Sequence, residues 1–276
     1  MNKERHILGI SGGKDSAALA VYMSQKFPDL DLEYFFTDTG EELPEVYDYL
    51  TKLEGYLGKQ ITRLNPSRNF QHHLKIYGYW LPSAQKRWCT DKLKIKPLEK
   101  WIKPDLDKGT KITSYVAIRY DEKFREGHQS THENYTVKLP FMDDKIDRKG
   151  VYDLLDNTGL GVPEYYQWRS RSGCTFCFFQ RKIEWVRLKE KHPDAFEFAK
   201  HLEGLSSANG VKFTWSERES LLELEKPERV EKIKEEHEKR RQRELAKRKV
   251  NPLDPDEFLD DDELFGQGKY CLTCHK

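Results

Sequence analysis

The sequence ILGISGGKDSAALAV, residues 7–21, predicts a strand, a tight turn and a helix in direct succession. The adjacent glycines Gly12 and Gly13 allow a sharp turn and leave no Cβ in the way of a ligand. The helix that follows directs its unpaired N–H groups and the positive end of its dipole into the turn. Such a turn binds phosphate. The alternative is an ordinary turn in which Asp15 and Ser16 only cap the helix.

Strand-like and helix-like segments alternate along the chain from this turn onward. Strands separated by helices form a parallel, twisted sheet with helices on both faces, and ligands lie at the carboxyl ends of its strands. We therefore expect an α/β, Rossmann-like fold with residues 11–16 at that edge. The predicted strands are 6–10, 32–36, 61–64 and 112–118, and the predicted helices are 16–27, 44–57 and 185–198.

The chain divides by composition into a nucleotide-binding α/β domain, residues 1–216, and a tail, residues 217–276. Within the first part, residues 121–192 form an irregular region expected to hold a substrate and a cluster. The tail begins with a charged helix over 228–249, continues as an acidic stretch over 251–265 and ends in a C-x-x-C-H motif. Neither a signal peptide nor an apolar run of about 20 residues is evident. We therefore expect a cytoplasmic protein with no membrane partner.

Two motifs carry a resemblance to a known family. The turn S-G-G-K-D-S resembles the pyrophosphate-binding loop of the adenine nucleotide α-hydrolase superfamily. After the second strand, FTDTGEELPE (residues 36–45) is similar to the F-x-D-T-G-x-E-x-P-E signature of phosphoadenylylsulfate (PAPS) reductases and their relatives. The resemblance implies their fold and a nucleotide site. Its residues would be Ser11, Gly12, Gly13, Lys14, Asp15 and Ser16 at the phosphates, and Asp38, Thr39, Gly40 and Glu41 at the nucleoside.

Three later segments extend the resemblance over about residues 5–185. RWCTDKLKIKPL (residues 87–98) resembles the family's R-x-C-x-x-x-L-K-x-x-P segment, which implies Lys94 as a further nucleotide-binding residue. AIRYDEKFR (residues 117–125) is a divergent form of G-x-R-x-x-E-S-x-x-R, in which Arg119 and Arg125 are candidates to grip phosphate or sulfate. The third segment, GCTFC (residues 173–177), matches a G-C-x-x-C found in family members.

The five cysteines allow several chemistries. Cys174 and Cys177 can chelate one metal, and Cys89 could add a third thiolate for a 4Fe–4S cluster. Cys271 or Cys274 could supply a fourth ligand. A zinc site built from the two C-x-x-C pairs is the alternative, and unreactive thiols are the third possibility. The terminal C-x-x-C-H also matches a c-type haem attachment motif, which the missing export signal disfavours.

The arrangement of cysteines is most similar to the ATP-pyrophosphatase subunits of DNA phosphorothioation systems. That resemblance implies cleavage of ATP, with Mg²⁺, to AMP and pyrophosphate while a DNA oxygen is adenylated for replacement by sulfur. Lys14, Asp15 and Arg119 are then the candidate catalytic residues. The implied partners are DNA, a cysteine desulfurase or another sulfur donor, and other subunits of a modification complex. Twelve Lys or Arg against six acidic residues over 86–125 favour a nucleic-acid partner. The alternative is an ordinary solvated basic face.

Three other functions stay open at this stage. A PAPS or adenylylsulfate reductase would use the nucleotide as its substrate, although the E-C-G-I-H-like motif of assimilatory enzymes is not found. A tRNA-thiolation enzyme would use the same adenylation on another nucleic acid. A non-catalytic adaptor would bind ATP in the turn and a partner protein along the charged helix.

Overall fold

Five parallel strands form one sheet in the computed structural model, which describes residues 4–122, 125, 132–210, 213–216 and 218–247. The strand order is β3-β2-β1-β4-β5. The four strands expected from the sequence are confirmed, with ends that shift by up to three residues, whereas the short β5 was not predicted. The strands are β1 (Glu4–Gly9), β2 (Leu32–Phe36), β3 (Ile61–Arg63), β4 (Lys111–Tyr115) and β5 (Tyr135–Lys138).

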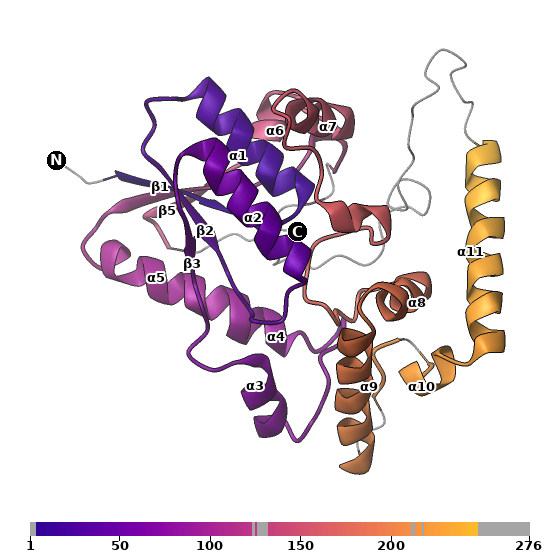
Figure 1. Ribbon diagram of the computed structural model, residues 1–276. Coiled ribbons are helices and arrows are strands. Elements are labelled where there is room, and N and C mark those ends of the chain that lie inside the picture. Colours follow the sequence, from indigo (N-terminus) through magenta and orange to yellow (C-terminus); the bar gives the residue numbers. More distant parts are fainter. Residues whose placement is uncertain (1–3, 123–124, 126–131, 211–212, 217, 248–276) are drawn as a thin grey trace.

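Helices cover both faces of this sheet, as the alternating pattern predicted (Figure 1). On one face, alternate strand residues such as Leu8, Tyr34 and Phe36 pack into a core with α1, α2 and α7. On the other, Ile7 and its neighbours pack against Ile102 of α5. These helices are α1 (Lys14–Lys26), α2 (Pro44–Leu57), α5 (Lys96–Leu106) and α7 (Arg148–Asp156).

Helix α1 is buried along nearly its whole length. Ala17, Ala18, Leu19, Ala20 and Val21 have no exposed surface, and the small side chains let the helix lie close to the sheet and to α7. A helix with so little polar surface depends on its neighbours for stability. The turn that precedes it is therefore held firmly in place.

The remaining helices gather around the carboxyl edge of the sheet and beyond it (Figure 1). A continuous helical stretch from Trp88 to Leu106 contains a π-helical turn, which is a frequent feature of functional sites. These elements are α3 (Phe70–Ile76), α4 (Trp88–Thr90), the π-helical η1 (Asp91–Ile95), η2 (Tyr120–Glu122), α6 (Pro140–Asp143), η3 (Glu164–Gln167), α8 (Lys182–Lys191), α9 (Pro193–Ala208), α10 (Leu221–Leu224) and α11 (Pro227–Lys247).

The single helix predicted over 185–198 is wrong. The structure divides this region at His192, where α8 ends and α9 begins. Pro193 is the cause, because its ring disfavours helical geometry at the preceding residue, and His192 has φ −134° and ψ 68°.

The charged helix predicted over 228–249 is confirmed as α11, which packs against α8. The acidic stretch 251–265, Cys271 and Cys274 lie outside the described residues. No helix in the described part of the chain is long and apolar enough to cross a membrane.

The chain crosses from β1 to β2 and β3 on one side, and then returns to place β4 and β5 on the other side of β1. The carboxyl ends of β1 and β4 therefore flank the point where the direction of winding reverses. In open α/β sheets ligands bind in the crevice at such a point. The turn at residues 10–13 directly follows β1 and lies at this position.

Gly12 has φ +73°, and a Cβ built on it would lie 2.5 Å from Cγ1 of the buried Val46 in α2. We expect Gly12→Ala to lower the free energy of unfolding by about 2–4 kcal/mol, from backbone strain plus overpacking. Gly58→Ala is the matched control, since Gly58 has φ +61° and no atom within 4 Å of such a Cβ. It should cost only about 1–2 kcal/mol. Urea unfolding measures both, and equal losses would exclude the contact with α2.

Candidate functional site

Two serines organise the turn between β1 and α1. The backbone N–H of Ser11 donates to Ser16 Oγ at 3.0 Å, and the N–H of Gly13 donates to Ser11 Oγ at 3.4 Å. Ser16 Oγ in turn donates to the Gly13 carbonyl at 3.1 Å. Gly13 is the N-cap of α1 and has no side-chain cap among the described residues. Asp15 and Ser16 therefore do not act as the N-cap considered from the sequence.

Residues 164–174, from η3 to Cys174, form a segment that lies over this turn although it comes about 150 positions later in the chain. This segment is the covering segment. Tyr165 donates its hydroxyl to the Gly12 carbonyl at 2.8 Å, and Ser172 Oγ lies 3.3 Å from Ser11 Oγ. The backbone N–H of Lys14 donates to the Tyr166 hydroxyl at 3.3 Å. A Cβ on Gly13 would lie 2.8 Å from Ser172 Oγ, so this segment also explains the second glycine. Sequence reasoning missed these contacts, which span about 150 positions.

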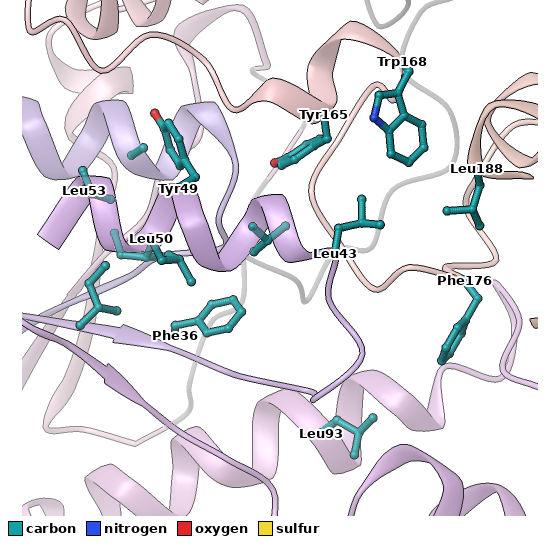
Figure 2. Close-up of a cluster of buried hydrophobic side chains, with 14 of the residues drawn as sticks. Phe36, Leu43, Tyr49, Leu50, Leu53, Leu93, Tyr165, Trp168, Phe176 and Leu188 are labelled. Atoms are coloured by element: carbon teal, nitrogen blue, oxygen red, sulfur yellow. The ribbon is translucent and has the colours of Figure 1, made fainter. Parts of the chain in front are cut away.

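Hydrophobic packing holds the covering segment in place. Tyr165 and Trp168 of this segment, and Phe176 just after it, belong to the same buried cluster as Phe36 at the end of β2 and Tyr49 in α2 (Figure 2). The segment is therefore anchored in the main core and presents its hydroxyls to the turn from a fixed position.

Arg169 lies in this segment and has only 2% of its surface exposed. Its Nη2 donates to the Cys174 carbonyl at 2.7 Å. Its Nε and Nη1 are buried without a hydrogen-bond partner among the described residues. A buried guanidinium with donors to spare is suited to an anionic ligand. No motif in the sequence singled out this residue.

Lys14 is fully buried at the first position of α1. Its Nζ lies 4.4 Å from the centre of the Tyr166 ring and 5.9 Å from that of Tyr152 in α7. Two aromatic faces thus surround the ammonium beside the glycine turn. This geometry places the Lys14 side-chain nitrogen where the sequence predicted phosphate.

A buried ion pair joins α1 to the chain that follows β4. Arg119 Nη1 lies 2.9 Å from Asp15 Oδ1, and both side chains are at most 3% exposed. Asp121 accepts from Arg119 Nε at 3.0 Å and from Nη2 at 2.9 Å. Glu122 lies 3.7 Å from Arg119 and 3.0 Å from Arg125. Burial lowers the pKa of Arg119, but Asp15, Asp121 and Glu122 more than offset this and raise it, so the guanidinium stays charged.

The turn after β2 carries the second group of expected nucleotide-binding residues. Asp38 Oδ1 accepts from the Gly40 N–H and from the Tyr47 hydroxyl, both at 2.8 Å. Gly40 adopts φ +75°, which suits glycine. Thr39 is buried and donates to Glu42 at 3.0 Å. Because β1 and β2 are parallel neighbours, this turn and the glycine turn lie at the same edge of the sheet.

Cys174 pairs with this second turn. Its Sγ lies 3.3 Å from Thr39 Oγ1 and 3.7 Å from Glu42 Oε1, and the Thr175 N–H donates to the Glu41 carbonyl at 2.7 Å. Burial raises the pKa of the Cys174 thiol well above its usual range, and the charge of Glu42 raises it further. The nearby charge of Lys94 lowers it, which places Lys94 close to this thiol.

The described cysteines do not by themselves fit a metal site. Cys89 is half-buried in α4, and Cys174 is a hydrogen-bonded thiol rather than an exposed thiolate. Among the residues that the structure describes, no group of three or more His, Cys, Asp or Glu is arranged to hold a metal ion. The predicted 4Fe–4S cluster and its zinc alternative stay predictions.

Residues 5–138, just under half of the chain, match the family described as phosphoadenosine phosphosulfate reductase domain. The matched region runs from β1 to β5 and contains the glycine turn, the second turn and Arg119. It supports the resemblance read from the motifs at the level of this domain. The finer resemblance to DNA phosphorothioation proteins stays a prediction.

Among curated relatives, the uncharacterized proteins MJ0066 and MJ0973 of Methanocaldococcus jannaschii are each 28% identical to this chain. The matches cover 71% and 67% of this chain but 40% and 44% of those proteins. The uncharacterized nin region protein ORF290 of Escherichia phage lambda is 29% identical over 44% of this chain and half of its own length. The chain thus spans less than half the length of its first two relatives.

Among solved structures, PAPS reductase from Candida auris is 15% identical with a TM-score of 0.48, covering 62% of this chain and 81% of its own. The U34-tRNA thiolase NcsA of Methanococcus maripaludis, solved with its 4Fe–4S cluster, is 14% identical with a TM-score of 0.41, covering 76% of this chain and 72% of its own. Both are similar to this chain at low identity.

The ion pair at Arg119 yields a stability prediction. We expect Arg119→Gln to lower the free energy of unfolding by about 3–5 kcal/mol, because it leaves the buried Asp15 carboxylate uncompensated. Asp15→Asn should cost less, since Arg119 keeps Asp121 and Glu122. Urea unfolding of both single variants and the double variant measures the coupling. The exposed pair Lys103–Asp107 is the control, and Lys103→Gln should change stability by less than about 0.5 kcal/mol. If Arg119→Gln lowered the free energy of unfolding by less than about 0.5 kcal/mol, the buried ion pair with Asp15 would not be stabilising.

Glu41 yields a pH prediction, because burial and the charge of Glu42 raise its pKa to about 7. The folded chain then binds a proton that the unfolded chain releases between about pH 4.5 and 7, so stability from this group falls as pH rises through that interval. Glu41→Gln removes the effect. The difference in free energy of unfolding, variant minus parent protein, should rise by about 1–2 kcal/mol from pH 4.5 to pH 7.5, after allowance for solvent screening. Glu99→Gln, at an exposed position of α5, is the control for loss of a surface carboxylate, and a difference for Glu41→Gln that does not change with pH would refute the shift.

Proposed function

We propose that this chain, which matches a PAPS reductase domain over residues 5–138, is an ATP pyrophosphatase that adenylates an oxygen for replacement by sulfur. The acceptor we favour is a phosphate oxygen of DNA, as in phosphorothioate modification. The observation that carries the proposal is the glycine turn at the reversal point of the sheet, with the buried Lys14 ammonium beside it.

The triphosphate would lie against the N-terminus of α1. The backbone N–H groups of Gly12 and Gly13 and the charge of Lys14 would hold its β- and γ-phosphates. Arg169, whose spare donors are buried in the covering segment, is a further candidate ligand. Mg²⁺ that arrives with ATP would neutralise phosphate charge. Tyr166 and Ser172 lie so near Gly13 that they would also limit the room for the bound group.

The nucleoside would bind at the turn after β2. Asp38 and the turn through Thr39, Gly40 and Glu41 would face the ribose and adenine, while the edge of β2 offers backbone groups to the base. Lys94, near Cys174, would add positive charge on this side of the site.

The reaction consists of two substitutions. The acceptor oxygen attacks the α-phosphorus, the bond from that phosphorus to the bridging oxygen of the β-phosphate breaks, and pyrophosphate leaves. A sulfur nucleophile then attacks the acceptor phosphorus, and AMP leaves with the oxygen. The two substitutions need no oxidant or reductant when the sulfur nucleophile is sulfide. A persulfide from a cysteine desulfurase would leave its carrier bonded to the new sulfur, and a thiol reductant would then have to release that carrier as a thiol.

The protein's contribution is to position the groups and to stabilise phosphate charge. In this scheme Arg119 acts through Asp15 to orient the first turn of α1, and its direct contact with phosphate stays a prediction.

The sulfur would come from a cysteine desulfurase or another donor, and other subunits would present the DNA. The same adenylation would also serve tRNA thiolation, with an RNA acceptor. The second candidate reaction is reduction of PAPS, which the family match over residues 5–138 favours. There a thiol would attack the sulfur of PAPS, adenosine 3′,5′-bisphosphate would leave, and a second thiol from the reductant would then displace sulfite and form a disulfide.

The deciding experiment is incubation of anaerobically prepared protein with Mg-ATP, and separately with PAPS plus a thiol reductant, followed by chromatography of the products. AMP and pyrophosphate from ATP in the presence of a nucleic-acid acceptor are the expected result. Sulfite from PAPS with ATP untouched would replace the proposal by the reductase.

Lys14→Met tests the residue on which the proposal rests. The side chain keeps its length but loses the charge, so we expect pyrophosphate release to fall at least about a hundredfold while the fold is kept. Lys52→Met, at an exposed position of α2, should leave the rate unchanged. Circular dichroism checks the fold of both variants. A folded Lys14→Met protein with an unchanged rate would contradict the role of Lys14.

A further inference from the structure

An exposed aromatic and basic surface surrounds the end of α3, on the part of the domain away from α1 and α7 (Figure 1). Ile76, Tyr77 and Trp80 expose 57%, 36% and 39% of their surface. They are three of the six large hydrophobic side chains that are exposed in the described part of the chain. Residues 68–96, which contain them, are called the α3 surface below. Large apolar side chains that cluster on a surface indicate a binding site.

The exposed rings of the α3 surface are held in fixed positions. Trp80 stacks on Phe213 with ring centres 4.8 Å apart and an interplanar angle of 28°. Its carbonyl accepts from Trp88 Nε1 at 3.0 Å, and Tyr77 lies 5.2 Å from the Trp88 ring. Tyr79 adopts a positive φ of +62°, which is strained for a residue with a side chain, directly before Trp80. Trp80 is therefore exposed to solvent in a fixed orientation.

The charge of the α3 surface is strongly one-sided. Residues 68–96 contain seven Lys or Arg and a single acidic residue, Asp91. That carboxylate lies 2.8 Å from Lys92 Nζ and 3.9 Å from Lys96 Nζ, so two ammonium groups share one negative charge. The pKa of His73 is lowered by burial and then by the nearby charges of His72, Lys92, Arg68 and Lys96. Positive charge thus gathers around the same aromatic side chains.

A chain of packed rings connects the α3 surface to the candidate site. Phe70 at the start of α3 lies 5.0 Å from Trp88 and 4.9 Å from Phe176, which stands between Cys174 and Cys177. Lys94, two residues after Lys92 in the π-helical turn, lies near Cys174. The α3 surface is therefore packed, through buried rings, against the segment that carries Cys174 beside the second turn.

We propose that the α3 surface binds unpaired nucleotides of a nucleic acid, with a base stacked on Trp80 and phosphates bound by Lys92, Lys96 and neighbouring basic residues. Exposed aromatic faces beside lysines are the usual means of binding single strands, because stacking needs bases that are not buried in a duplex. The inference deepens the proposed function, on which it rests for the reaction, by specifying an unpaired acceptor. DNA is the acceptor that the proposed function favours, and RNA offers the same bases and phosphates.

Binding without ATP tests this surface independently of the reaction. Fluorescence anisotropy of the full chain would use a labelled single-stranded DNA 12-mer, the same sequence as RNA, and its DNA duplex. We expect the single strand to bind at least tenfold more tightly than the duplex. Trp80→Ala should weaken single-strand binding about tenfold or more, and Trp80→Phe should keep most of it, because the ring is retained. Tyr56→Ala, at an exposed ring of α2, is the matched control and should have no effect.

The double variant Lys92→Gln, Lys96→Gln tests the phosphate contacts. It should reduce the slope of log affinity against log salt by about 1.4, the value for two contacts on a single strand. Equal affinity for duplex and single strand, or unchanged binding by folded Trp80→Ala, would overturn the proposal. Absence of binding to both DNA and RNA single strands at low salt would also overturn it. Binding of the single strand without pyrophosphate release would support the α3 surface and refute the proposed reaction. Pyrophosphate release without binding of the single strand would support the reaction and refute the α3 surface. Stronger binding of RNA would direct the search for the acceptor to RNA.

Discussion

The constraint on which the site depends is the lack of room for side-chain atoms at the turn between β1 and α1. Gly12 is pressed against Val46 of α2, and Gly13 against Ser172 and Tyr166 of the covering segment. Side chains of α2 and of the covering segment therefore both approach the backbone of this turn. Because α1 is buried along its length, the turn cannot relax by moving the helix. In the proposed function, the backbone N–H groups of this turn would therefore meet the phosphates from a fixed position.

The charges near this turn form a second constraint. Lys14 and Arg119 are both buried, and each cation is matched by nearby groups: aromatic faces for Lys14, and carboxylates for Arg119. Asp15 links the two, because it follows Lys14 in α1 and pairs with Arg119 after β4. The ion pair thus ties the first turn of the helix to the neighbouring strand. A phosphate ligand would add negative charge beside Lys14 without disturbing the carboxylates that hold Arg119.

The candidate site and the α3 surface share the helical stretch that starts at Trp88. Trp88 supports the exposed rings, Lys92 belongs to the basic group, and Lys94 lies near Cys174. The π-helical turn changes the direction in which side chains point along this stretch. The stretch from Trp88 to Ile95 can therefore place some side chains on the α3 surface and others at the edge of the sheet.

The sequence by itself determined the parallel α/β fold, the glycine turn and the turn at residues 38–41, because hydrophobic periodicity, the alternation of strand-like and helix-like segments, and glycine conformation are local patterns. The order of the strands was decided by the tertiary structure, since β1 pairs with β4. The sequence could not reveal that Tyr166 and Ser172 contact the turn, or that the Cys174 thiol lies 3.7 Å from Glu42 Oε1. It also missed the break at His192, although Pro193 was a readable signal. These features were decided by tertiary structure, because each depends on side chains brought together from positions far apart in the chain, whose distances no local pattern encodes.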